Sequence, residues 1–138
     1  MNGPSPHLSW AELSCKDGTP YPHEWRQTRA VAVAKAFEAL RAAVGLPLVV
    51  LSGYRTPRHN TRIGGARNSQ HVQGRALDLL PPKGWTVLQL AAVARTIPAI
   101  RGLGFYRTFL HIDVRESDRL AVWHGPRAEA DGEVTALT

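Results

Sequence analysis

One long helical pattern most constrains the fold of this chain. From about Glu24 to Val44, apolar side chains recur at steps of three, four or eight residues, and Gly45 follows where a helix commonly ends. The pattern therefore predicts a helix over this range. The apolar positions that define it are Trp25, Val33, Phe37, Leu40 and Val44.

Short strand-like runs come after this helix. "PLVVLSGY" predicts a buried strand that ends in a turn, and "RALDLL" predicts a second strand that Pro81 and Pro82 stop. "GLGFY" and "FLHIDV" predict a hairpin or two adjacent strands. The intervening "RTPRHNTRIGGARNSQ" is so polar and so rich in Gly, Asn and Pro that we expect an irregular loop there.

Two capping boxes mark the starts of further helical segments. Ser9 with Glu12 predicts a short helical turn near the start of the chain. Thr86 with Gln89 predicts a helix that ends before Pro98. The order of these elements predicts an α+β fold with a small antiparallel β-sheet flanked by helices, because helices come first and short strands with one inserted helix follow.

Length and composition indicate a single domain. We expect it to cover 1–138, with a core from about 8 to 124 and a loose tail over 125–138. No apolar run is long enough to span a membrane, and the start "MNGPSPHLSW" lacks the regions of a secretory signal, so we expect synthesis in the cytoplasm. The lone Cys15 excludes an internal disulfide and a multi-cysteine zinc site, and we expect it to be a small buried apolar residue.

The positive charge of the chain does not by itself indicate a nucleic-acid partner. The formal net charge is +6 and the pI is about 10.2. The arginines are scattered along the chain without a dense basic run, so we expect solvated surface charge and no specific nucleic-acid partner. A bacterial cell wall rich in phosphate and carboxylate is a polyanion that would suit the same charge.

The stretch "SQHVQGRALDL" places His71 and Asp78 seven residues apart, with the acid at the start of an apolar strand. A salt bridge and a metal site both explain this pair, and the spacing alone favours structural roles because short motifs often match by chance. A catalytic zinc site needs three protein ligands, and His111 is the best third one. Side chains alternate along a strand, so His111 and Asp113 would share the face opposite the core.

The end of the first strand adds a basic residue to this set. "SGYR" followed by a long loop leaves Arg55 exposed above the sheet, next to where His71 returns. A guanidinium there could hold a substrate carboxylate or carbonyl oxygen through two hydrogen bonds. "SGYR", "SxHxxGxAxD", "GxGFY" and "HxD" together form a pattern too long for chance agreement, which favours the metal site over the salt bridge.

This ordered pattern resembles the zinc peptidases of the D-alanyl-D-alanine carboxypeptidase family, peptidase family M15, and above all their small single-domain branch in bacteria and phages. The resemblance runs from about Leu8 to Trp123 and includes the opening "LSWAELSCKDG". It implies the fold of Hedgehog and D-Ala-D-Ala peptidases, with a zinc cleft on the sheet. It also implies hydrolysis of amide bonds in peptidoglycan stem peptides or cross-links, as D,D-carboxypeptidases or endopeptidases perform it.

The resemblance implies roles for individual residues. His71, Asp78 and His111 would bind Zn²⁺. Arg55 would act in catalysis and, with Ser69 and Tyr106, would contact the substrate. These roles are carried over position by position from the motifs "SGYR", "SxHxxGxAxD", "GxGFY" and "HxD".

The chain departs from several branches of this family just before the last ligand. Those branches carry a catalytic acid or histidine two or three residues earlier, where this chain has Phe109 and Thr108. Asp113 is the nearest carboxylate, and it could act as the general base or could orient His111 from behind. His124, in "AVWHGP", is a further candidate for acid–base work or substrate contact. Surface or structural roles are expected of His7, His23 and His59.

Three classes of function therefore stay open. The first is a zinc peptidase that acts on peptidoglycan after release or delivery, for example by a phage particle. The second is a zinc-bearing but weakly active or inactive module that binds the cell wall or forms part of a larger, phage-like particle. The third is a basic nucleic-acid binder, for which the sequence offers charge alone. The residues fix neither the bond that is cleaved nor the oligomeric state.

Overall fold

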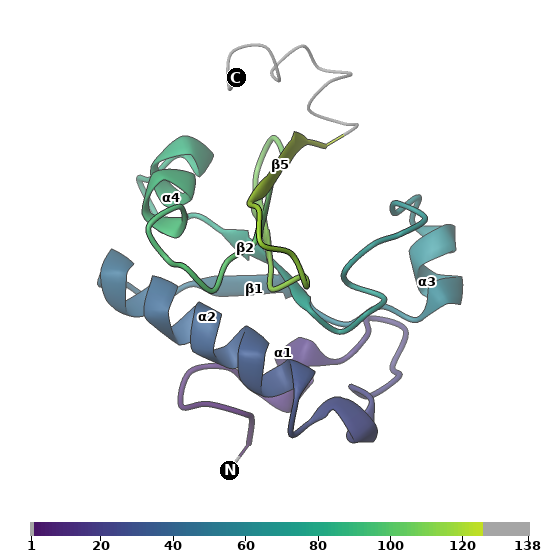
Figure 1. Ribbon diagram of the computed structural model, residues 1–138. Coiled ribbons are helices and arrows are strands. Elements are labelled where there is room, and N and C mark those ends of the chain that lie inside the picture. The colour runs from purple at the N-terminus through teal and green to yellow at the C-terminus, as the bar shows by residue number, and fades with distance from the viewer. Residues whose placement is uncertain (1, 126–138) are drawn as a thin grey trace.

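A computed structural model describes residues 2–125 of the chain (Figure 1). The helices are α1 (Trp10–Leu13), α2 (Arg29–Val44), α3 (Pro57–Arg62) and α4 (Val87–Ala94), with a 3₁₀ turn, η1, at His23–Trp25. The strands are β1 (Val49–Ser52), β2 (Ala76–Leu80), β3 (Gly102–Phe105), β4 (Leu110–Asp113) and β5 (Ala121–His124). Apart from Gly125, the tail predicted over 125–138 lies outside the described residues.

The described strands form one mixed sheet in the order β1-β2-β4-β3-β5. The pairs β1–β2, β2–β4 and β4–β3 are antiparallel, as the sequence predicts. β5 adds a strand parallel to β3, which the sequence pattern did not indicate. Gly102 of β3 pairs with both Asp113 and Ala121, so the connection from β4 to β5 crosses the start of β3. The α+β class and the single small domain are confirmed.

Helix α2 ends where predicted and begins later. Gly45 terminates it with a positive φ of 77°, a conformation that glycine adopts without strain. The helix begins at Arg29 because the residues before it form the turn η1. Trp25 of that turn packs edge-on against Tyr21 and Tyr54, with ring centroids 6.3 and 5.9 Å apart. Its place in the apolar pattern thus reflects an aromatic cluster and not the helix.

The segment expected to be an irregular loop contains helix α3. Pro57 stands in its first turn, and the Oγ1 of Thr56 accepts a hydrogen bond from the N–H of His59 at 3.1 Å. Proline suits this position because its fixed φ matches a helix and its missing N–H needs no partner. The loop prediction was wrong for this stretch because overall Gly and Asn content outweighed a local capping signal.

Both predicted capping boxes are present. The hydroxyl of Ser9 accepts a hydrogen bond from the N–H of Glu12, whose carboxylate accepts one from Ser9 in return. Thr86 and Gln89 form the same reciprocal pair at the start of α4. Each box satisfies N–H groups that would otherwise lack partners at a helix start.

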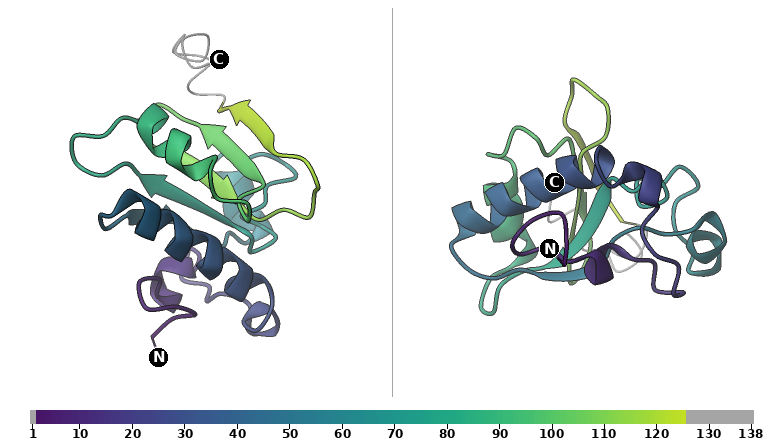
Figure 2. Two further views of the ribbon diagram at one scale, coloured as in Figure 1. Left: turned by 60° about the vertical axis from the view of Figure 1, so that its left-hand side comes forward. Right: turned by 90° about the horizontal axis from the view of Figure 1, so that it is seen from below.

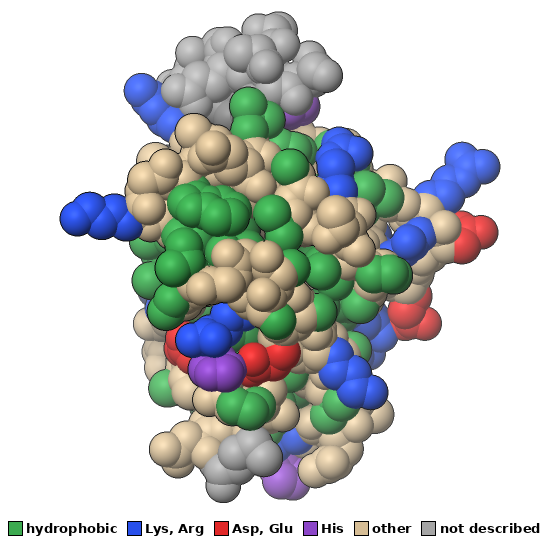
Figure 3. Space-filling model, turned by 90° about the vertical axis from the view of Figure 1, so that its left-hand side faces the viewer, with side chains coloured by type: hydrophobic (Ala, Val, Ile, Leu, Met, Phe, Trp, Pro, Cys, Tyr) green, Lys and Arg blue, Asp and Glu red, His purple; other side chains and the backbone are tan. Residues whose placement is uncertain are grey.

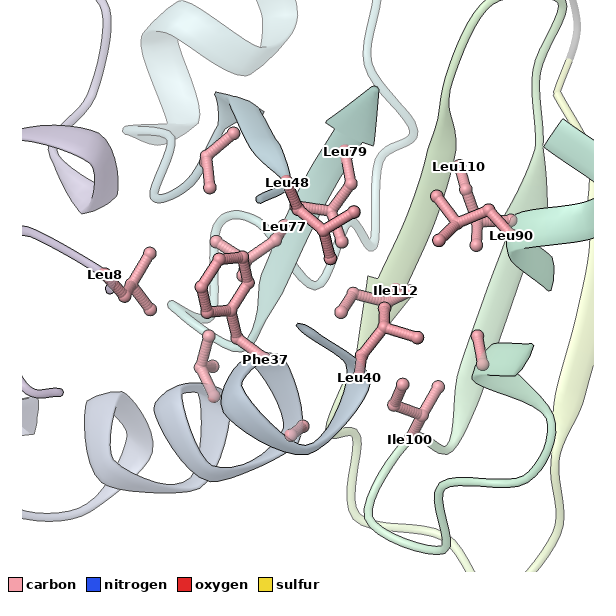
Figure 4. Close-up of a cluster of buried hydrophobic side chains, with 14 of the residues drawn as sticks. Leu8, Phe37, Leu40, Leu48, Leu77, Leu79, Leu90, Ile100, Leu110 and Ile112 are labelled. Atoms are coloured by element: carbon pink, nitrogen blue, oxygen red, sulfur yellow. The ribbon is translucent and has the colours of Figure 1, made fainter. Parts of the chain in front are cut away.

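A layer of apolar side chains fills the space between the helices α2 and α4 and one face of the sheet (Figure 4). Phe37 and Leu40 of α2 meet Leu77 and Leu79 of β2, and all four are fully enclosed at 0% exposure. Leu90 continues the layer from α4. Burial of each such side chain contributes about 1.5–3 kcal/mol to stability, which makes this layer the main source of folding energy.

The two faces of the sheet have different surroundings. α2 and α4 lie on one side of it and the short α3 lies on the other (Figures 1 and 2). Leu110 and Ile112 of β4 point into the core, so the alternation of the strand turns His111 and Asp113 to the face that no long helix covers.

The outer surface carries its positive charge in separate places on the face drawn in Figure 3. Lys and Arg side chains are spread over it, and some lie directly beside Asp or Glu side chains. Among residues 2–125, no helix has both the length and the apolar character that crossing a membrane requires.

Candidate metal centre

Asp78 and His111 lie directly opposite each other on paired strands. β2 and β4 run antiparallel with Asp78 across from His111 and Leu77 across from Ile112. Because Leu77 and Ile112 belong to the core, the acid and the imidazole project together from the other face. Both are almost enclosed, with exposed fractions of 4% and 5%.

The loop before β2 brings His71 to this pair. Gly74 turns the chain there with a φ of 69°, and its Cα lies so close to the Trp25 ring that a side chain would collide with it. Nδ1 of His71 lies 2.7 Å from the carbonyl oxygen of Gly53. A carbonyl can only accept a hydrogen bond, so Nδ1 carries the hydrogen and Nε2 keeps its lone pair.

Three donor atoms then converge in one buried place. Nε2 of His71 lies 3.0 Å from Oδ1 of Asp78 and 3.2 Å from Nδ1 of His111. That Nδ1 lies 3.3 Å from the same carboxylate oxygen. The other ring nitrogen of His111 lies 2.7 Å from the Asp113 carboxylate, which accepts its hydrogen, so the neutral imidazole has its lone pair on Nδ1. Burial lowers the pKa of His111, but the contacts with Asp113 and Asp78 outweigh it and raise that pKa, so a metal at Nδ1 would have to displace a proton.

With both imidazoles neutral, their two lone pairs and the carboxylate oxygen repel one another at these distances, and a cation among them would remove that repulsion. Two histidines and one carboxylate are a ligand set that zinc takes in catalytic sites, where a fourth position stays open. The donor atoms of His71, Asp78 and His111 all lie within 4.8 Å of one another, so the residues fit a metal ion of this kind.

The electrostatics keep two of these groups in the forms that bind metals. Burial raises the pKa of the Asp78 carboxyl, but the neighbouring His71 and His111 outweigh it and hold that pKa well below its usual range. Burial lowers the pKa of the His71 imidazole. An anionic carboxylate and a neutral imidazole are the ligand forms that a divalent cation requires.

Asp113 lies behind His111 and not beside the three donor atoms. Its Oδ2 binds Nε2 of His111, the ring nitrogen that faces away from His71. Arg115 donates two hydrogen bonds to the same carboxylate, from Nε to Oδ1 at 2.9 Å and from Nη2 to Oδ2 at 2.7 Å. Burial raises the pKa of Asp113, while the hydrogen bonds from Arg115 and then His111 hold it well below its usual range. Gly102 makes room for this group, because a Cβ there would overlap the carboxylate.

Arg55 is not the exposed residue that the sequence suggested. Only 14% of its side chain is exposed, and Nη2 binds Oδ2 of Asp78 at 3.1 Å. Nε contacts the hydroxyl of Ser52, and Nη1 contacts Oδ1 of Asn60, both at 3.3 Å. The expectation was wrong because α3 folds back and brings Asn60 over the guanidinium. Arg55 therefore supports the carboxylate oxygen that does not face the histidines.

The structure does not bring His124 to the metal centre. Its ring packs on Phe105, a core residue, with centroids 5.5 Å apart, so it lies on the opposite face of the sheet. The neighbouring Trp123 takes the place on the metal side, with its ring 4.9 Å from that of His111. Gly104 allows this approach, since a Cβ there would collide with the indole.

Ser69 adjoins the centre through His71, whereas the contacts of Tyr106 are with Phe109 and Gly125. Tyr106 follows β3 and stacks on Phe109 across the hairpin, with ring centroids 4.5 Å apart. The Oγ of Ser69 accepts a hydrogen bond from the N–H of His71 at 3.1 Å, so it fixes the loop that carries this histidine.

An open cavity of about 590 Å³ lies beside the loop that carries His71; Ser69 lines it, but His71, Asp78 and His111 do not. Arg115 reaches it from the Asp113 carboxylate, and the connection between β4 and β5 forms its other wall. The basic side chains that line it are Arg67, Arg75, Arg115 and Arg119. Arg75 pairs with Glu116, whereas Arg67 and Arg119 have no ion pair with any residue in 2–125. The cavity thus favours anionic groups.

The fold and the site define a class of protein: a small α+β domain with a buried His-Asp-His centre on the open face of its sheet. The sequence profile of Peptidase M15 matches residues 6–114, and the chain belongs to this family. A zinc D-Ala-D-Ala carboxypeptidase of Streptomyces albus G is 33% identical over 81 residues, which are 57% of this chain and 32% of that protein. The chain thus spans about a third of that relative's length. Family and relative together support a zinc peptidase.

Proposed function

We propose that this protein is a zinc-dependent peptidase that hydrolyses amide bonds in the stem peptides or cross-links of peptidoglycan. The observation that carries the proposal is the convergence of His71, Asp78 and His111, whose lone pairs and charge fit a zinc ion. When bound, zinc acidifies a water ligand and polarises a carbonyl, the chemistry that amide hydrolysis needs.

The residues around the ligands have separate tasks in this proposal. Asp113 and the Gly53 carbonyl hold the two imidazoles in the orientation and tautomer that point a lone pair at the metal. Arg55 holds Asp78 in place, and its guanidinium could stabilise charge developing on a scissile carbonyl oxygen. Trp123 shields one side of His111 from water.

The basic cavity supports a peptidoglycan peptide as the substrate. Stem peptides carry free carboxylates, and arginines bind carboxylates with paired hydrogen bonds. Arg67 and Arg119 are exposed and unpaired within residues 2–125, so they are available for such a group. The name of the Streptomyces relative, a D-Ala-D-Ala carboxypeptidase, is consistent with this substrate class.

A second candidate function is a module that binds the cell wall without cleaving it. The observation in its favour concerns the general base. Among residues 2–125, Asp78 and Asp113 are the carboxylates that contact His71 or His111, and Asp113 is already bound to Arg115 and to the far nitrogen of His111. Thr108 and Phe109 offer no acid in the positions that other family branches use.

Incubation with purified peptidoglycan and with defined stem peptides tests both functions. The peptidase should release amines or D-alanine, should lose this activity with a chelator and should regain it with zinc. His71→Ala should be inactive, and His23→Ala, which changes an exposed histidine, should behave as the unaltered protein. If the protein sediments with peptidoglycan but releases no amines in the presence of zinc, the peptidase proposal is wrong and the binding module is the better one.

A further inference from the structure

A second group of possible metal ligands lies outside the centre described above. Cys15 and Asp17 stand in the loop after α1, and His59 stands in α3. The sulfur of Cys15, a carboxylate oxygen of Asp17 and a ring nitrogen of His59 all lie within 4.8 Å of one another. Thiolate, imidazole and carboxylate are each ligands of zinc.

Ordinary hydrogen bonding does not account for His59. Its Nδ1 is buried and has no hydrogen-bond partner, and neither of its ring nitrogens bonds to another residue in 2–125. A buried polar atom without a partner costs free energy, so some further group is expected beside it. Cys15 is buried as the sequence predicts, with 3% of its surface exposed, yet its sulfur lies beside a carboxylate and an imidazole. These surroundings are not those of a purely apolar residue.

Asp17 is held in position and kept ionised. Its Oδ1 accepts a hydrogen bond from the N–H of Thr19 at 2.9 Å, and its Oδ2 accepts one from the hydroxyl of Thr56 at 3.0 Å. These contacts, with that of the Cys15 thiol, hold the pKa of Asp17 below its usual range. A carboxylate has further lone pairs, so both hydrogen bonds can persist while the group binds a cation. Contacts of this kind orient a ligand in advance.

We propose that Cys15, Asp17 and His59 form a second site for zinc or a similar divalent transition metal. A thiolate and a carboxylate together supply two negative charges, which balance a divalent cation, and the imidazole adds a neutral donor. Because Asp17 is exposed, a water molecule could occupy the fourth coordination position of the metal.

The site would tie two segments that are distant in the sequence. The loop after α1 would be fixed to α3, and α3 carries Asn60, which binds Nη1 of Arg55. Arg55 in turn binds Asp78. A metal on Cys15 and His59 would therefore hold the helix that positions the guanidinium of the first centre.

Cobalt titration of the metal-free protein separates the two sites. The first centre contains no sulfur, so thiolate-to-cobalt charge-transfer absorption in the near ultraviolet reports the second alone. We expect this absorption in the unaltered protein and in His71→Ala, and its loss in Cys15→Ser and in His59→Ala. Elemental analysis should give two zinc ions per chain, falling to one in His71→Ala and to one in His59→Ala.

The measurement has a clear contrary result. If cobalt gives no charge-transfer absorption and zinc saturates at one ion per chain, the second site does not exist. If Cys15→Ser does not fold, Asp17→Asn takes its place as the test variant. Asp17 is exposed, and asparagine keeps the shape of its side chain. Full charge-transfer absorption at the same cobalt concentration in Asp17→Asn would remove the carboxylate from the ligand set. Because the readout is spectroscopic, it stands whether or not the first centre hydrolyses peptides.

Discussion

Asp113 binds the ring nitrogen of His111 that points away from the other two ligands, at 2.7 Å. This contact gives His111 a fixed tautomer and leaves Nδ1 free to face His71 and Asp78. A carboxylate in that position, further bound by Arg115, acts on the metal through the imidazole. The sequence left two roles open for Asp113, and this geometry favours the orienting one.

Asp113→Asn should therefore weaken zinc binding by about 10–100-fold, and added zinc should restore hydrolysis. The amide keeps the shape of the carboxylate but loses its charge and the strong hydrogen bond to His111. Zinc affinity and peptide hydrolysis should be measured on the same preparation. Lost hydrolysis with unchanged zinc affinity would instead identify Asp113 as the general base.

His71→Ala should abolish zinc binding at the first centre. Removal of one of three protein ligands leaves too few donors to hold the ion at ordinary concentrations. Zinc content after dialysis, measured beside the exposed-surface control His23→Ala, checks this. Equal affinity for zinc at this centre in both variants would show that His71 is not a ligand.

Arg55→Lys should reduce turnover by about 10²-fold or more if the guanidinium stabilises charge on the reacting carbonyl. Lysine keeps the positive charge but cannot contact Ser52, Asn60 and Asp78 at once. Zinc content should persist, because all three ligands remain. Turnover equal to that of the unaltered protein would limit Arg55 to neutralising Asp78, a task that a lysine performs as well.

Gly102→Ala should weaken zinc binding without altering any ligand. A methyl group there would overlap the Asp113 carboxylate and push it from His111. Such overpacking costs about 1–3 kcal/mol of stability, so the midpoint temperature of thermal unfolding should fall together with the zinc affinity. Leu88→Ala, at an exposed position of α4, is the matched control and should change neither quantity appreciably. Unchanged zinc affinity in Gly102→Ala would show that the position of Asp113 does not matter.

Arg119→Gln should discriminate between substrates with and without a free carboxylate. Two stem peptides that differ by one carboxylate against its amide should show different KM with the unaltered protein, and the difference should shrink in the variant. The exposed arginine lines the cavity but contacts no ligand residue, so kcat should change little. Identical KM ratios in both proteins would remove Arg119 from substrate recognition.

The sequence predicts those parts of the centre that depend on local geometry. Alternation along "FLHIDV" was enough to place His111 and Asp113 on one face, because it is a property of any strand. Trp123 could not be placed in the same way. Its position depends on the parallel pairing of β5 with β3, across a connection without a diagnostic turn signal. Arg55 was misjudged for a similar reason, since its burial depends on Asn60 and on how α3 folds back.

The wide separation of the donors along the chain has a consequence for folding. His71 and His111 are 40 residues apart, and they meet because β2 and β4 are paired. No shorter piece of the chain holds all three donors, so zinc should bind the native state and have little affinity for the unfolded one. A ligand of this kind stabilises the native state by about 2.7 kcal/mol at a concentration one hundred times its Kd. Metal supply would then govern not only whether the protein acts but also how long each molecule escapes unfolding and proteolysis.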